Sequence, residues 1–171
     1  MKRWKRILVP TDFSPCAIAA LDLAAELAAE SGGTIVLEHS TERPRGLDAT
    51  AQLHVGRGDA PVDVWVHEQV RPRLEALAEP LRARGVDVEL RSDVGKPSKA
   101  ILSAIEASGA DLVVLGTHGR AGLAHILLGS VAEEVVRKAH VPVLTVRGGC
   151  AVTDGVDDDE IEHQLDAETQ G

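Results

Sequence analysis

The sequence is poor in aromatic residues, cysteine and long apolar runs, and each shortage excludes a class of protein. Aromatic residues make up 2% of the 171 residues, with one phenylalanine and no tyrosine, which argues against base stacking on single-stranded nucleic acid. The two cysteines, Cys16 and Cys150, show no metal or redox spacing and imply no disulfide framework. No apolar run approaches the ~20 residues of a membrane span, and the basic residues 1–6 lead into a short strand rather than a signal-peptide core. We therefore expect a cytoplasmic protein without a membrane partner.

Acidic residues outnumber basic ones, and the excess lies at the end of the chain. The formal net charge of −9 argues against a nucleic-acid partner. Residues 148–171 contain eight acidic residues and no lysine or arginine, so the preceding residues are almost neutral. A chain of this length, 44% hydrophobic, is long enough for one domain with a core and short for two. We predict a single domain over residues 1–147 and a disordered acidic tail over residues 148–171.

Apolar runs alternate with helical patterns along this predicted domain. We expect strands at 7–9, 34–39, 86–90, 111–116 and 142–147, and helices at 15–31, 62–84, 97–108 and 130–139. Ser14 and Pro15 predict a capped start for the first helix, while Pro72 and Pro80 are expected to shorten, kink or break the second. Residues 41–61, rich in proline, glycine and charge, are interpreted as a long mobile loop, either a lid or a surface excursion. Strands separated by helices indicate an α/β fold with a five-stranded, mostly parallel open sheet and helices on both faces.

The stretch from Leu112 to Ser130 is the most informative part of the chain. An apolar run stops at Gly116, and a glycine-rich segment then leads to Ser130, where a helical pattern begins. Glycine lets the backbone approach a ligand closely, and Ser130 is expected to cap a helix whose amino end attracts anions. The pattern therefore predicts either a phosphate cradle or a plain strand–loop–helix turn. It contains neither a Walker-type P-loop nor the dinucleotide-binding G-x-G-x-x-G motif.

Several blocks together resemble one known family. Gly116-Thr117-His118-Gly119, followed after nine residues by Gly129-Ser130, is similar to the G-2x-G-9x-G-[S/T] signature of the ATP-binding branch of the universal stress protein family. The resemblance continues in three further blocks, so that it covers residues from about 4 to 147 in order. These blocks are Arg6-Ile7-Leu8-Val9-Pro10-Thr11-Asp12-Phe13-Ser14, Val94-Gly95-Lys96-Pro97, and His140-Val141-Pro142-Val143-Leu144-Thr145-Val146-Arg147.

The resemblance implies a doubly wound, Rossmann-like sheet with strand order 3-2-1-4-5. That order places Asp12 and the Gly116 loop in one crevice at the carboxyl ends of the strands. The implied ligand is ATP, with or without Mg²⁺. The candidate contact residues are Pro10, Thr11, Asp12, Ser40, Leu115, Gly116, His118, Gly119, Arg120, Gly129, Ser130 and Val131.

Some of these residues also fit other roles. Asp12 fits a ribose or metal contact and equally a turn or capping carboxylate, while Val131 fits a core position as well as a contact. His118 and Arg120 are placed to meet phosphate oxygens or to remain solvated. Ser40 replaces the apolar residue that usually packs against adenine in the family. Outside this set, Lys96, Lys99, His125 and Cys16 are interpreted as surface or packing residues.

The leading hypothesis is a nucleotide-responsive dimer of the universal stress type that acts in the stress response through a protein partner. The apolar fifth strand is expected at a sheet edge, and the resemblance implies a homodimer joined there; the alternative is a monomer whose tail covers the edge. A second hypothesis is a slow ATP hydrolase or nucleotidyl-transferring enzyme. The sequence offers no catalytic residue for one, because it lacks a paired general base, a Walker lysine and a metal-ligand cluster. A third is an interaction module that binds no nucleotide.

Overall fold

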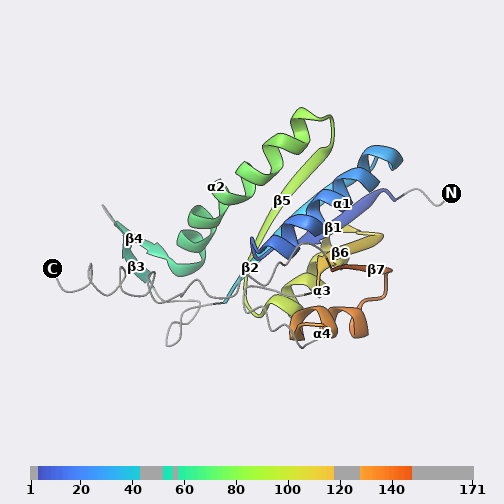
Figure 1. Cartoon of the computed structure of the whole chain (residues 1–171). Coiled ribbons are helices and arrows are strands. Elements are labelled where there is room, and N and C mark those ends of the chain that lie inside the picture. The colour runs from blue at the N-terminus through green and yellow to red at the C-terminus, as the bar shows by residue number, and fades with distance from the viewer. Residues whose placement is uncertain (1–3, 43–51, 56–57, 118–127, 148–171) are drawn as a thin grey trace, which may run out of the picture.

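A single parallel sheet organises the chain (Figure 1). The computed structural model describes residues 4–42, 52–55, 58–117 and 128–147. Its main sheet has five strands in the order β5-β2-β1-β6-β7, and every neighbouring pair is parallel. The strands are β1 (Arg6–Pro10), β2 (Thr34–Thr41), β5 (Asp87–Val94), β6 (Leu112–Gly116) and β7 (Val143–Val146). Counted along the chain within this sheet, the order is 3-2-1-4-5, which confirms the predicted fold and places β7 at an edge.

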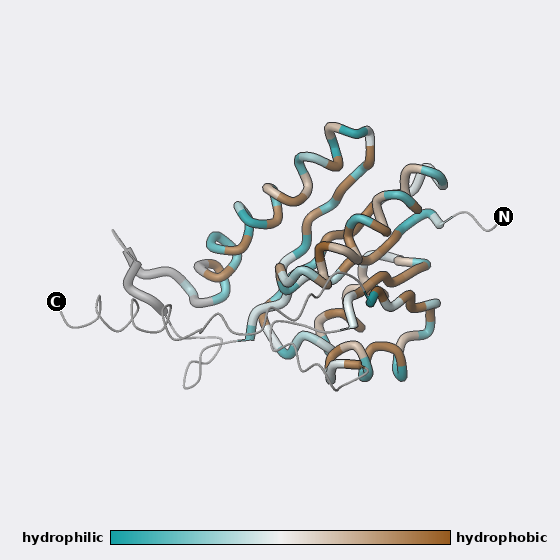
Figure 2. Tube along the Cα trace, in the orientation of Figure 1, coloured by the Kyte–Doolittle hydropathy of each residue, from teal (hydrophilic) through white to brown (hydrophobic). Residues whose placement is uncertain are grey.

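Two helices cover each face of the sheet. Helices α1 (Pro15–Ser31) and α2 (Val62–Ala83) share one buried cluster with Ile7, Ile35 and Leu37 of the central strands. Helices α3 (Pro97–Ser108) and α4 (Ser130–Lys138) share the other with Leu8 and Val36. Successive residues of a strand point to opposite faces, so each central strand contributes to both clusters. Figure 2 shows the consequence as apolar colour concentrated along the central strands.

Helix α1 begins and ends as its sequence predicts. The Ser14 hydroxyl accepts a hydrogen bond from the Ala17 N–H at 3.3 Å, and Pro15 occupies the first turn. The helix ends at Gly32, whose φ of +66° is the left-handed conformation that glycine tolerates best. These local signals fix where the helix starts, immediately after the loop that follows β1.

Helix α2 runs through both of its prolines without interruption. Of the predicted shortening, kink or break, the shortening and the break are therefore wrong, and the kink stays a prediction. Both prolines are exposed, as are Glu68 and Ala76, the residues four positions before them. A proline removes the hydrogen bond to the carbonyl four residues earlier. On this side of the helix water can reach those carbonyls, while Val70, Leu74 and Ala78 are buried on the other side.

The stretch interpreted as a loop contains a second, small sheet. Strands β3 (Gln52–Val55) and β4 (Gly58–Pro61) pair antiparallel as a hairpin that contacts α2. The prediction of an irregular loop over residues 41–61 is therefore wrong at these positions, and β2 also extends to Thr41. Strands of four residues are too short to show a clear two-residue period. Whether the hairpin acts as a lid stays a prediction.

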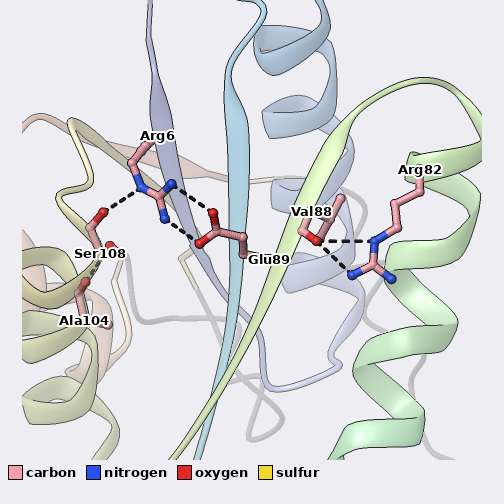
Figure 3. Close-up of polar contacts among 6 residues, drawn as sticks. All are labelled: Arg6, Arg82, Val88, Glu89, Ala104 and Ser108. Carbon is pink, nitrogen blue, oxygen red and sulfur yellow. Dashed lines mark hydrogen bonds and ion pairs between the residues drawn. The ribbon is translucent and has the colours of Figure 1, made fainter.

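Charged side chains tie the elements together at the amino ends of the strands (Figure 3). The Arg6 guanidinium forms an ion pair with Glu89 of β5, and its Nε donates to the Ser108 carbonyl at 2.6 Å. Arg82 of α2 donates through Nη2 to the Val88 carbonyl at 2.8 Å. These contacts occupy the end of the sheet opposite to the one that carries the candidate site. None of the described helices combines the length and the hydrophobicity needed to cross a membrane.

Candidate functional site

The strand order places a topological switch point, the position where open α/β sheets form a binding crevice, at the carboxyl ends of β1 and β6. From β1 the chain proceeds outward to β2 and β5, and α3 then carries it back across the sheet to β6. Open α/β sheets bind ligands where the direction of winding reverses in this way. Asp12 lies two residues after the end of β1, Gly116 ends β6, and Ser40 lies near the end of the neighbouring β2. The fold thus brings these three candidate residues to the same end of the sheet.

Asp12 belongs to a tight turn between β1 and α1. Its Oδ1 accepts a hydrogen bond from the Ser14 N–H at 3.0 Å, while the Thr11 hydroxyl accepts from the Phe13 N–H at 3.0 Å. The turn role that we considered for Asp12 is therefore present in the structure. The residue is half-buried rather than buried, so part of it remains accessible at this end of the sheet.

Phe13 holds this turn in an unusual conformation. Its φ is +66°, and among the described residues it is the only one other than glycine with a positive φ. A bulky residue in the left-handed region is strained by ~1–3 kcal/mol, so other contacts must stabilise it. The Phe13 ring lies 4.7 Å from the His39 ring, and the Arg73 guanidinium carbon lies 3.8 Å from its centroid. His39 Nδ1 also lies 2.7 Å from the Thr11 carbonyl, which can only accept, so Nδ1 donates. No pattern along the chain predicts this cluster, because its members come from three separate elements.

Gly116 is packed tightly against the first turn of α1. A Cβ atom at this position would lie 2.9 Å from the carbonyl carbon and 3.0 Å from the carbonyl oxygen of Cys16. The first glycine of the motif is therefore required by packing, whatever ligand the crevice holds. Cys16 is a buried residue within α1, which confirms its interpretation as a small helix residue.

Two backbone hydrogen bonds fix the ends of the glycine-rich segment. The Gly129 N–H donates to the Thr117 carbonyl at 2.7 Å, and the Thr117 N–H donates to the Val146 carbonyl at 3.1 Å. Helix α4 begins at Ser130, but Gly129 is its capping residue and no side chain caps it. The prediction that Ser130 caps α4 is wrong, because Ser130 is already the first helical residue. An amino end without a side-chain cap leaves N–H groups that can bind an anion.

The other candidate residues divide into buried, half-buried and undescribed ones. Pro10, Thr11 and Leu115 are buried, so any contact that they make with a ligand has to come largely from the backbone. Val131 is half-buried against the core cluster of α3 and α4, which fits the core role that we considered for it. Ser130 is exposed. His118, Gly119 and Arg120 lie outside the described residues, as does His125.

Lys96 is not simply a surface charge. Its Nζ lies 2.7 Å from Glu134 of α4, whose carboxylate also accepts from Ser98 at 2.7 Å and from Lys138 at 2.6 Å. Hydrogen bonds from Lys138, Lys96 and Ser98 hold the pKa of Glu134 well below its usual range. The cluster links the start of α3 to α4, so it helps to place the helix that borders the crevice.

Glu38 of β2 lies near the candidate site, although the sequence patterns do not predict it as a contact residue. It lies in β2 with 1% of its surface exposed, and burial, together with the nearby charge of Asp93, raises its pKa to about 8. Its Oε1 atom has no hydrogen-bond partner. A charged residue in the middle of an apolar parallel strand was the available signal, because such residues are rarely buried without a partner.

The comparison with known protein families shows which family the chain belongs to. The family model described as the universal stress protein family matches residues 3–147. This chain belongs to the universal stress protein family. Two curated relatives from Methanocaldococcus jannaschii agree. Universal stress protein MJ0531 is 32% identical over 148 residues, 84% of this chain and 82% of that protein. Universal stress protein MJ0577 is 30% identical over 155 residues, 84% of this chain and 95% of that protein.

Solved structures of universal stress proteins have the same architecture. The structure of MJ0577 has a TM-score of 0.70 to this chain at 28% identity, covering 86% of this chain and 99% of that one. A universal stress protein in complex with cAMP has a TM-score of 0.62 at 25% identity, covering 85% of this chain and 98% of that one. These two matches span nearly the whole of each solved structure, so they include the strand ends at which the candidate site lies.

Proposed function

We propose that this universal stress protein binds an adenine nucleotide in the crevice between β1 and β6, and that this nucleotide is ATP. The observation that carries the proposal is the placement of Asp12 and Gly116 at the carboxyl ends of adjacent strands, beside the amino end of α4. The phosphates would meet the glycine-rich segment and the first N–H groups of α4, and Asp12 would accept from the ribose hydroxyls. The complex of a similar universal stress protein with cAMP supports the choice of an adenine nucleotide.

Mg²⁺ would bind at this site together with the nucleotide, coordinated mainly by phosphate oxygens and water rather than by a set of protein ligands. The described residues contain no group of three or more His, Cys, Asp or Glu side chains that could hold a metal ion. Magnesium in nucleotide sites usually keeps several waters and takes one or two carboxylates with the phosphate oxygens. Asp12 is the carboxylate in the right place to take part.

The nucleotide would act as a signal that a partner reads in the stress response. Binding can change the surface of the protein only if ATP has different affinities for two conformations. The glycine-rich segment and the β3–β4 hairpin are the parts from which such a change would start. This proposal requires no turnover of ATP.

Replacing Asp12 with asparagine is expected to weaken ATP binding by about 10- to 100-fold, because a charge-assisted hydrogen bond is worth roughly 1.5–3 kcal/mol. The amide oxygen of asparagine still accepts from the Ser14 N–H, so the turn is kept. Calorimetric titration with ATP, with and without Mg²⁺, measures the change. The control is Asp22→Asn, which removes an exposed carboxylate of α1. Equal affinities for both variants, or no binding by the unaltered protein at millimolar ATP, contradict the proposal.

We also propose that two copies join through β7. This strand is at the edge of the sheet, and an edge presents unpaired N–H and C=O groups to another strand. Leu144 of β7 is 38% exposed and, as the register partner of Val114, lies on the face of the sheet that α1 and α2 cover. A partner strand at this edge would cover its side chain.

Leu144→Asp is therefore expected to convert a dimer into a monomer in light scattering after size-exclusion chromatography, since a buried unpaired carboxylate opposes association. Val64→Asp, at a 46% exposed position of α2, is the matched control and should leave the dimer intact. A monomer for the unaltered protein, or a dimer that persists in Leu144→Asp, would exclude association through this edge.

A further inference from the structure

The strongest unexplained feature outside the predicted contacts is the buried carboxyl of Glu38. The Glu38 carbonyl accepts from the Thr11 N–H at 2.8 Å, so its peptide group is held beside the residue that precedes Asp12. The side chain has 1% of its surface exposed, and its Oε1 atom lacks a hydrogen-bond partner. Leaving a buried polar atom without a partner costs free energy. A group of this kind next to a binding crevice suggests a use for that oxygen.

The surroundings of Glu38 form a polar stripe that leads to the crevice. Glu38 and Ser40 lie on one face of β2, and their register partners on β5 are Arg91 and Asp93. The Arg91 guanidinium forms an ion pair with Asp93, with Nε at 2.6 Å and Nη2 at 2.9 Å from the two carboxylate oxygens. The Ser40 hydroxyl hydrogen-bonds to the Glu38 carboxyl and lies two residues nearer the end of the strand. The stripe thus runs from Glu38 through Ser40 to the rim of the crevice.

We propose that Glu38, with Ser40 beside it, recognises the base of the bound nucleotide, its carboxyl pairing with the amino-bearing edge of adenine. This inference rests on the proposed nucleotide site. It gives a role to two polar residues near the carboxyl end of β2, one of which carries a buried oxygen without a hydrogen-bond partner among the described residues. Because Oε1 makes no hydrogen bond within the described part of the protein, it is available to form one with the base.

The protonation state of Glu38 decides which purine fits. With a pKa of about 8, the carboxyl is mostly neutral at pH 7 and offers one O–H donor beside one acceptor. Adenine presents the complement, a ring nitrogen that accepts and an amino group that donates. The ionised carboxylate only accepts, which suits the two donors of guanine. The protein should therefore prefer adenine at neutral pH and lose this preference as the pH rises.

Within the part of the chain that the structure describes, few charged groups surround Glu38 to alter its protonation. On its face of the sheet, β5 contributes Arg91 and Asp93, whose charges compensate each other. From β1 the neighbours are Leu8 and Pro10, and the buried residues of α3 are Ser98, Ile101, Ala104 and Ile105. None of these residues from β1 and α3 titrates. Burial is thus the main cause of the raised pKa of Glu38, and the Arg91–Asp93 pair is the main charged influence on it.

The test is calorimetric titration of the full chain with ATP and with GTP at about pH 6.5 and about pH 9, below and above the pKa of about 8. In the unaltered protein the ratio of ATP to GTP affinity is expected to fall roughly tenfold between these values, the size expected for one hydrogen-bond pair. Glu38→Gln keeps a donor and an acceptor, so its preference for ATP should persist at both pH values. Because ionisation of the nucleotides affects this variant and the unaltered protein equally, the variant also serves as a control for that effect of pH.

Two further variants complete the experiment. Glu38→Leu removes both polar atoms and should bind ATP and GTP with similar affinity, through their phosphates and ribose. Asp93→Asn removes the repelling charge and releases Arg91, so the change in preference should move to lower pH. A packing role for Glu38 would not produce that displacement.

The outcomes separate the two proposals. If the unaltered protein binds neither nucleotide, the proposed function fails. If it binds ATP but Glu38→Leu keeps the same ratio of ATP to GTP affinity, or the ratio in the unaltered protein does not change with pH, the base-reading role alone is overturned. Should Glu38→Leu fail to fold, the comparison of the unaltered protein with Glu38→Gln still decides the question.

Discussion

Replacing Gly116 with alanine is expected to lower the free energy of unfolding by about 1–3 kcal/mol, the usual cost of forcing an extra methyl group into a packed interior. The new Cβ would lie 2.9 Å from the Cys16 carbonyl carbon. The obstacle is backbone, in the first turn of α1, so no side-chain rotation relieves it. Helix and strand must move apart, which also displaces the turn that carries Asp12. Thermal unfolding should show a lower midpoint, by about 2–4 °C for each kcal/mol.

Gly33→Ala is the matched control for this substitution. A Cβ at Gly33 would lie 2.5 Å from the Trp4 carbonyl oxygen, at the amino end of β2 and far from the crevice. Both variants should be less stable, but only Gly116→Ala should also bind ATP more weakly when folded. If Gly116→Ala unfolds at the same temperature as the unaltered protein, the close contact with α1 is not a constraint. Loss of ATP binding in both variants would instead point to a general loss of structure.

Replacing Glu38 with glutamine is expected to remove a large pH dependence of stability. Burial raises the pKa of Glu38 from its ordinary value of 4.5 to about 8. The unfolded chain therefore ionises this group at lower pH than the folded protein does, and stability declines as the pH rises through the window from about 4.5 to about 8. The full span corresponds to at most about 5 kcal/mol. Glutamine does not ionise, so Glu38→Gln should match the unaltered protein near pH 5 and be more stable near pH 9.

Urea unfolding at several pH values measures this effect. The control is Glu89→Gln, because the hydrogen bond from Arg6 lowers the pKa of Glu89. The sign is opposite there: the stabilisation by Glu89 is present above its ordinary pKa and is lost as the pH falls through the lowered one. Glu89→Gln should therefore lose stability near neutral pH and little in acid. If Glu38→Gln and the unaltered protein show the same slope between pH 5 and 8, Glu38 is not held neutral by its surroundings.

Most elements are predictable because their signals are local. Ser14, Pro15 and Gly32 delimit α1 through contacts within a few residues, and the structure has them as expected. The hairpin at residues 52–61 escapes prediction because its strands are too short to show a period. The two prolines of α2 mislead for another reason. Their effect depends on which side of the helix faces the core, and the sequence around a proline does not state this.

The family, the order of strands and helices, and the pieces of the glycine motif can all be recognised without a structure, because they are encoded in patterns along the chain. The contact of Gly116 with Cys16 and the position of Glu38 beside Arg91 and Asp93 cannot. Those relations join segments that are about 50 to 100 residues apart in the sequence. They depend on strand register and helix packing, which set distances to within an ångström and decide the charge of a buried carboxyl.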